Sequence, residues 1–343
     1  MSSYMQRQFV PYAILCRLGG CFFIQNFWKP LENAKVTWRS LYTVYSAFFI
    51  ALNFSFDIVL IVQESYVFRD LSQAFSPSLI LILRMVVTSK IFLSAGAMAT
   101  GSVGLLDFFK KSFMCEKVTG FSPARRDLRA FWKHRWSLFR RILVLIGFIS
   151  TYIISMLPFM YSLGELLPAS FSFLGQISAV LGAWCYLLYD ALPYMVLRSC
   201  SAVLVEYLDV QLKTFQRCCK FKPSLNERKS SEQLEVIRHN ISKITDLKDS
   251  LNAIAQVPLA TMSAGVLMFD CVVCYAMFND GFFATDVPLA LSYCVYSSFA
   301  FMDLAFASQA LTDKAQKLSN ATKVAPTFGA SDEYVQEVRC LSK

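Results

Sequence analysis

Six apolar segments, each long enough to cross a lipid bilayer, constrain this chain more than any other feature of its sequence. Crossing the hydrocarbon core takes about 20 residues of helix, and isolated strands cannot satisfy their backbone hydrogen bonds in lipid. We therefore predict an all-α fold, a polytopic membrane helix bundle of six spans. The predicted spans are Leu41–Gln63, Leu79–Val103, Ile142–Leu163, Phe173–Val196, Ile254–Phe278 and Val287–Leu311.

The composition excludes a water-soluble enzyme and a disordered chain. The hydrophobic residues AVILMFWYC make up 55% of the 343 residues and the charged residues 17%, whereas a soluble domain has about 45–50% apolar and about 25% charged residues. A disordered chain needs the opposite balance of apolar and charged residues. The surplus of apolar side chains therefore indicates helices that face lipid.

The distribution of basic residues predicts the orientation in the membrane. Of 33 Lys and Arg residues, 5 lie in residues 1–40, 10 in 107–141, 9 in 206–252 and 5 in 312–343, whereas the three other connections together carry only Arg69. Cytoplasmic loops are enriched in Lys and Arg. We therefore expect a cytoplasmic N-terminal segment (1–40), a six-span bundle (41–311) with long cytoplasmic loops at 107–141 and 206–252, and a cytoplasmic C-terminal segment (312–343), so that both termini lie inside.

The loop at 206–252 is expected to be largely helical. Its apolar residues recur at intervals of three and four, which is the spacing of one helix face. Spans four and five should therefore extend into the cytoplasm, with a break near Lys220–Glu232, where Pro223 and polar residues gather. The apolar positions are Leu234, Ile237, Ile241, Ile244, Leu247 and Leu251.

No motif points to an enzyme, a cofactor or nucleic acid. The chain has only two histidines, and it contains no HExxH, Walker-type, GxSxG or Gly-rich dinucleotide motif. We expect no catalytic residue, no metal and no cofactor. The run Lys110–Arg141, with interleaved aromatic residues, joins two spans and is expected to contact anionic membrane lipid. A six-span transporter for small molecules is an alternative, although the sequence shows no internal repeat of interrupted helices.

Ionisable residues inside spans are costly in lipid and usually face the bundle interior. Asp57 and Arg84 are expected at similar depth in neighbouring spans, as either a structural ion pair or part of a ligand site, and Asp270 lies in an outer half. Aromatic and polar side chains also gather in the outer halves, where they form either a cavity for a small, partly apolar ligand or an interfacial belt. The candidate ligand-binding residues are Asp57, Arg84, Tyr152, Phe159, Gln176, Trp184, Tyr186, Asp270, Tyr275, Tyr293 and Tyr296.

Three stretches carry a resemblance to a known family. Val10–Gly20 is an apolar run that leads to an Arg-Leu-Gly step before span one, Asp246–Leu259 leads into span five, and Phe301–Leu318 leaves span six with Ala315 and Leu318. With a cytoplasmic N-terminus, short outer loops and long basic inner loops, this pattern resembles the arthropod gustatory and odorant receptor superfamily, and specifically its gustatory branch.

The resemblance implies a gustatory-type chemoreceptor in the plasma membrane, a ligand-gated cation channel that assembles as a homo- or hetero-tetramer with other receptor subunits. A small-molecule tastant would enter an outward-facing pocket, and a seventh helix would line the pore. The family's motif in that helix, Thr-Tyr followed after five apolar positions by Gln-Phe, does not occur before Lys343. The expectation is therefore a receptor subunit without its seventh helix, and a nonconducting modulatory or truncated subunit stays open as the alternative.

Overall fold

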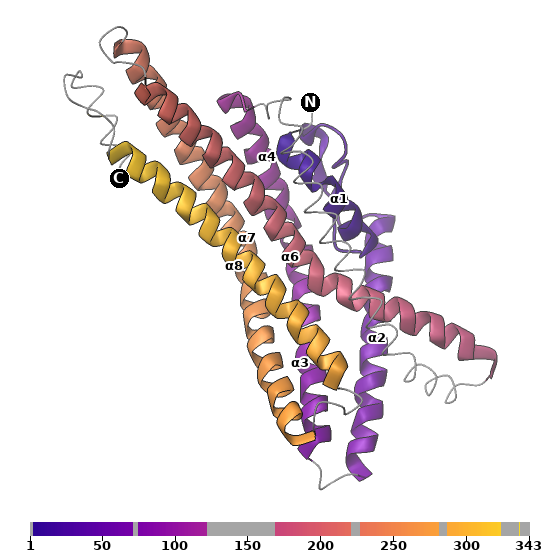
Figure 1. Cartoon of the computed structure of the whole chain (residues 1–343). Helices are drawn as coiled ribbons and strands as arrows, with labels where there is room; N and C mark the ends of the chain where they lie inside the picture. The colour runs from indigo at the N-terminus through magenta and orange to yellow at the C-terminus, as the bar shows by residue number, and fades with distance from the viewer. Residues whose placement is uncertain are drawn as a thin grey trace.

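The computed structural model describes residues 3–70, 75–121, 169–220, 227–280, 287–323 and 336, which form a bundle of long helices (Figure 1). Five of these helices contain predicted spans, and the third predicted span lies outside the described residues. The prediction of an all-α bundle is confirmed. The described elements are α1 (Tyr4–Leu18), β1 (Ile24–Gln25), η1 (Leu31–Asn33), β2 (Lys35–Val36), α2 (Leu41–Asp70), α3 (Phe75–Thr100), α4 (Ser102–Thr119), α6 (Ala169–Lys220), α7 (Glu227–Asp280) and α8 (Val287–Lys323).

The second predicted span ends at a sharp bend. The helical axes on the two sides of Gly101 differ by 50°, and α4 continues to Gly120, whose φ of 59° ends the helix in the left-handed conformation that glycine favours. A Cβ on Gly104 would lie 3.3 Å from Cγ1 of Ile254, so this glycine lets α7 approach closely. Residues 107–119, at the start of the predicted basic loop, are therefore helical and follow α3 after the bend.

The prediction that the helices of spans four and five continue beyond the spans is confirmed, and their cytoplasmic placement stays a prediction. Helix α6 runs on to Lys220 and α7 begins at Glu227. The apolar positions of the 206–252 segment are buried as a single helix face, except that Ile241 is only partly buried. Leu234 of this face forms a buried cluster with Phe215, near the end of α6, and Leu318, near the end of α8. The three-four spacing therefore predicted both the helix and its buried side.

The N-terminal segment contains a helix and two short strands, which the sequence analysis did not predict. Ser3 and Gln6 form a reciprocal capping box at the start of α1, and β1 pairs antiparallel with β2 in the segment that follows. Helix α1 and the segment that contains β1 and β2 form a hydrophobic core with α4 and α6. Its centre is a group of phenylalanines that are at most 1% exposed, namely Phe9, Phe22, Phe27, Phe108 and Phe109.

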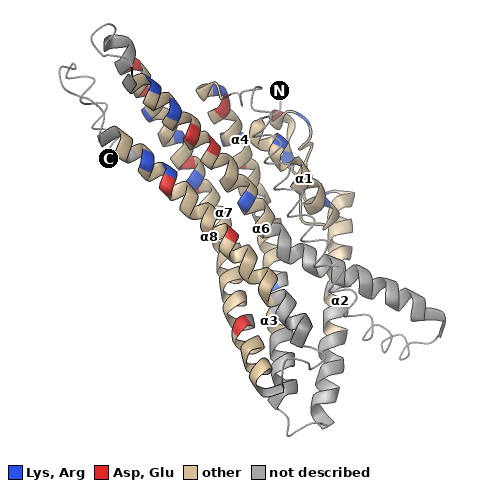
Figure 2. Cartoon of the chain, viewed as in Figure 1, with Lys and Arg blue, Asp and Glu red and all other residues tan. Residues whose placement is uncertain are grey.

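The termini of the described bundle lie at one end (Figure 1). Helix α1 and the last turns of α8 both reach the part of α6 that follows Arg198, because Tyr4 bonds Glu206 and Lys314 pairs with Asp209. We define the charged end as α1, β1, β2 and α4 together with residues 198–220, 227–252 and 312–323. Figure 2 shows that the charged residues of the described helices gather there.

The remaining described parts of the helices form the apolar end, which overlaps the predicted spans. By length and hydropathy alone, the described stretch Glu232–Tyr275 could cross a bilayer. Among the described residues, the bent pair Thr88–Thr100 and Ser102–Thr119, whose second helix is α4 of the charged end, passes the same test when it is counted as one unit. Helix α6 packs against α7 and α8, while α3 packs against α7 and α2.

Candidate functional site

Asp270 joins α7 to α8 in the region where the sequence predicts a ligand cavity. The Cys294 thiol donates to Asp270 Oδ1 at 2.6 Å, and the Ser298 hydroxyl donates to the same carboxylate at 3.3 and 3.5 Å. The two α8 residues are four apart and so share one helix face. Asp270 therefore holds the two helices in register, whatever further role it has.

Of the other predicted ligand residues, the structure describes the side chains of two, Tyr275 and Tyr296. The side chain of Tyr275 is 39% exposed on α7, whereas Tyr296 on α8 is buried at 9%. Neither belongs to the hydrogen-bonded group around Asp270. The remaining candidates lie outside the residues whose side chains the structure describes: Asp57, Arg84, Tyr152, Phe159, Gln176, Trp184, Tyr186 and Tyr293.

A second polar group connects α6 to α8 nearer the charged end. Arg198 Nε donates to Asp303 Oδ2 at 3.0 Å, and the Tyr194 hydroxyl donates to the same oxygen at 2.6 Å. The side chains of Arg198 and Asp303 are only 21% and 20% exposed. Charge-assisted hydrogen bonds of this kind are shorter and stronger than neutral ones. This group fixes the separation of α6 and α8 at the edge of the predicted spans.

Beside that group lies a cavity of about 380 Å³ between α6, α7 and α8. Its size lies within the range of small-molecule pockets, about 300–1,000 Å³. Most of its lining is aliphatic or aromatic. The polar lining residues are Ser201, Lys248, Asn252, Ser263 and Ser308. Sequence analysis did not predict this cavity, because apolar periodicity marks helix faces without showing where facing side chains are too small to fill the space.

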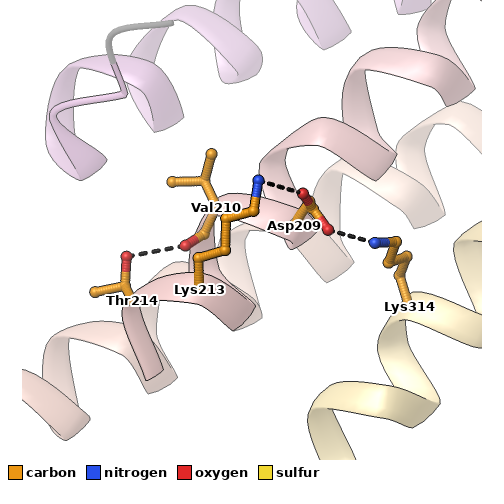
Figure 3. Close-up of polar contacts among 5 residues, drawn as sticks. All are labelled: Asp209, Val210, Lys213, Thr214 and Lys314. Atoms are coloured by element: carbon orange, nitrogen blue, oxygen red, sulfur yellow. Dashed lines mark hydrogen bonds and ion pairs between the residues drawn. The ribbon is translucent and has the colours of Figure 1, made fainter. Parts of the chain in front are cut away.

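Asp209 links α6 and α8 within the charged end (Figure 3). Its carboxylate pairs with Lys213 at 2.9 Å within α6 and with Lys314 of α8. Partial burial alone would raise the pKa of Asp209, but the hydrogen bonds and charges of the two ammonium groups outweigh burial and lower it. The link is therefore ionised at neutral pH.

Glu116 of α4 anchors the start of α1. Its carboxylate accepts the backbone N–H groups of Tyr4 at 2.6 Å and Met5 at 2.9 Å, and it also accepts the Tyr207 hydroxyl of α6. A carboxylate is favourable at a helix N-terminus, where backbone N–H groups lack partners within the helix. One buried side chain thus ties α1, α4 and α6 together.

A second carboxylate holds the same helix. The Tyr4 hydroxyl donates to Glu206 Oε2 at 2.6 Å. Burial raises the pKa of Glu206, the Tyr4 hydrogen bond lowers it, and the charge of Asp209 raises it, with a net upward shift. Neither Glu116 nor Glu206 was predicted as a site residue, since both lie in segments that the sequence marks only as charged.

The sequence of this chain also matches a known protein family. This family is described as the 7tm chemosensory receptors, and its sequence pattern matches residues 14–334 of this chain. This chain belongs to the 7tm chemosensory receptor family. The resemblance drawn from the sequence to the insect-type chemoreceptors is therefore confirmed.

Solved structures of insect chemosensory receptors share the fold. The olfactory receptor OR5 from Machilis hrabei is 14% identical to this receptor, with a TM-score of 0.68 over 99% of this chain and 88% of that one. OR5 in complex with eugenol gives a TM-score of 0.68 over the same shares at 13% identity. No curated protein sequence is significantly similar to this receptor. At this identity the likeness shows that the helical bundle is shared.

Proposed function

We propose that this chemosensory receptor is a gustatory-type subunit of a ligand-gated cation channel, opened by small organic molecules at the plasma membrane. One observation carries the proposal: the family pattern spans nearly the whole chain. The Machilis receptor that shares its fold forms a complex with eugenol, a small aromatic molecule. The Arg-Leu-Gly step before α2 favours the gustatory branch. Assembly with other subunits as a homo- or hetero-tetramer, with both termini cytoplasmic, belongs to the same proposal.

The ligand would bind among α2, α3, α6, α7 and α8 in the outer halves of the spans. Asp270 lies at the α7–α8 seam of that region and holds Cys294 and Ser298. A ligand that prefers a different spacing of α7 and α8 would shift the equilibrium between closed and open arrangements. The cavity beside Asp303 supplies room for α6 and α8 to move relative to α7.

The test is expression of the receptor in cultured cells, alone and with other receptor subunits of the family, with a calcium readout. Panels of sugars, bitter compounds and volatile odorants distinguish gustatory from olfactory type. We expect a response to at least one nonvolatile class. A response confined to volatile odorants would contradict the gustatory assignment, and an effect seen only as altered responses of co-expressed subunits would favour a modulatory role.

Site variants then locate the ligand. Trp184→Ala, Tyr186→Ala and Asp270→Asn should change the ligand concentration for half-maximal response at least several-fold, because pocket aromatics and a helix-linking carboxylate act on binding or its coupling. Phe299→Ala is the matched control, since this α8 side chain is 51% exposed on the outside of the bundle. Unchanged responses in all three variants with normal surface expression would place the ligand elsewhere.

A further inference from the structure

An open groove lies where α1 meets the start of α2. It encloses about 500 Å³, and its lining combines one cation, three aromatic rings and two aliphatic side chains. The lining residues are Ile14, Arg17, Leu18, Trp28, Tyr42 and Tyr45. None of these residues takes part in the networks around Asp270, Asp303 or Asp209.

Hydrogen bonds hold the walls of the groove in place. The Tyr42 hydroxyl donates to the Arg17 carbonyl oxygen at 2.9 Å, and the Tyr45 hydroxyl donates to the Leu18 carbonyl oxygen at 2.6 Å. Because their hydroxyls bind the last turn of α1, the two tyrosines are fixed relative to the helix that carries Arg17. The Arg17 guanidinium carbon lies 5.0 Å from the centre of the Tyr42 ring, within the range of a cation–π contact. The charge is thus presented from a prearranged position.

Beside the groove residues Tyr42 and Tyr45 in the sequence, α2 carries an apolar stripe. Leu41, Val44 and Phe48 are 90%, 67% and 67% exposed and recur at the spacing of one helix face. This stripe lies at the beginning of the first predicted span, where lipid would cover it. Leu18 and Trp28, which line the groove, are also 61% and 50% exposed. A molecule with a polar head and a long apolar chain could therefore occupy the groove and the stripe together.

The charge of the surroundings favours an anionic head. Residues 1–40 contain five basic residues and a single acidic one, Glu32. Within the described part of the chain, no carboxylate forms an ion pair with Arg17. Guanidinium groups bind phosphate through parallel N–H···O hydrogen bonds, and aromatic rings are favoured at the level of lipid headgroups.

We propose that this groove binds an anionic glycerophospholipid, with the headgroup phosphate on Arg17 and an acyl chain along Leu41, Val44 and Phe48. The lipid comes from the leaflet that faces α1, which is the cytoplasmic leaflet in the orientation proposed above. Its binding would add an external tie between α1 and α2 and so stabilise the charged end at the membrane surface.

The test is lipid retention and thermal stabilisation of the purified receptor. The receptor in neutral detergent is mixed with phosphatidylserine or phosphatidylcholine, and bound lipid is counted by native mass spectrometry. We expect preferential retention of phosphatidylserine with a raised melting temperature. Arg17→Gln should lower the affinity for phosphatidylserine about fivefold, which corresponds to about 1 kcal/mol for one basic residue at a membrane surface. This readout requires neither channel opening nor a known tastant, so it can fail or succeed independently of the proposed function.

Arg7→Gln is the matched control, because Arg7 is an exposed basic residue on the same helix and does not line the groove. Equal losses in both variants would show diffuse attraction by net charge and overturn the site. Equal retention of the two lipids by the unmodified receptor would overturn it as well. If Arg17→Gln fails to fold, Leu18→Ser tests the apolar wall instead, and unchanged retention in that variant would also count against the site. Soluble glycerophosphoserine at the same concentration should give no stabilisation, because the groove is proposed to bind lipid rather than free phosphate.

Discussion

Phenylalanine side chains are buried at the charged end of the bundle and exposed at the apolar end. At the charged end, Phe9 and Phe109 are completely buried, and their ring centres are 4.8 Å apart. At the apolar end, Phe278 and Phe306 are 93% and 64% exposed. A phenylalanine facing water is unfavourable, whereas one facing lipid is not. The charged end is therefore packed like a small soluble domain, and the apolar end presents its aromatic residues outward.

The polar side chains show the same contrast. At the charged end, Glu116 alone accepts hydrogen bonds from two backbone groups and a tyrosine. At the apolar end, Asp270 bonds only a thiol and a hydroxyl of the neighbouring helix in the described region. One end is held by dense polar and aromatic packing and the other by single seams between long helices. Such seams are the natural place for a ligand to change helix spacing.

Truncating a buried phenylalanine at the charged end should have the largest effect. Phe9→Ala removes the centre of the aromatic group and should lower the free energy of unfolding by about 3–5 kcal/mol, as large-to-small core substitutions do. Thermal unfolding in detergent, with gel filtration as a folding check, measures the loss. Phe48→Ala is the control, because its side chain is 67% exposed on α2. Equal losses in the two variants would contradict the contrast between the ends.

Neutralising Glu116 should have the next largest effect. Glu116→Gln keeps the shape but removes the charge that accepts the Tyr4 and Met5 N–H groups, and hydrogen bonds to charged groups contribute about 1.5–3 kcal/mol. We expect a loss of about 2 kcal/mol and faster tryptic cleavage after Arg17, because α1 detaches first. Asp107→Asn on the same helix should change little, since it removes only an exposed pair with Lys111. Unchanged cleavage in the Glu116 variant would show that this carboxylate does not anchor α1.

The sequence predicted the apolar end and the helical extensions better than the folded N-terminal segment. Hydropathy located five of the long described helices, and the buried face from Leu234 to Leu251 followed from spacing alone. The same rules could not place Phe9 against Phe109, because those residues are 100 positions apart and belong to segments of mixed character. Hydropathy likewise indicated that Asp270 is unusual, but only the packing of α7 on α8 shows that Cys294 and Ser298 are its partners.

At the seam between α6 and α8, Asp303→Asn should have an intermediate effect. It removes the negative charge that pairs with Arg198 and accepts the Tyr194 hydroxyl, and we expect a loss of about 1–2 kcal/mol because the pair is largely buried. If the seam also takes part in gating, the half-maximal ligand concentration should shift. Asp313→Asn, an exposed change on the same helix, is the control. Identical melting temperatures for the two variants would show that the ion pair between Arg198 and Asp303 does not stabilise the fold.

The smallest effect should appear as a pH dependence at Glu206. Burial raises the pKa of this carboxyl above its ordinary value of 4.5 despite the Tyr4 hydrogen bond, with Asp209 as a further raising charge. The folded receptor therefore holds the Glu206 proton to higher pH than the unfolded chain does, so this group's contribution to stability falls as pH rises above that ordinary value. Melting temperatures between about pH 4.5 and 7 should decline less steeply in Glu206→Gln than in the unmodified receptor, whereas Glu235→Gln, an exposed carboxylate on α7, should leave the slope unchanged. A slope unaltered by Glu206→Gln would mean that other groups set the pH response. In that case the charged end would hold α1 through Glu116 without a proton-sensitive second contact.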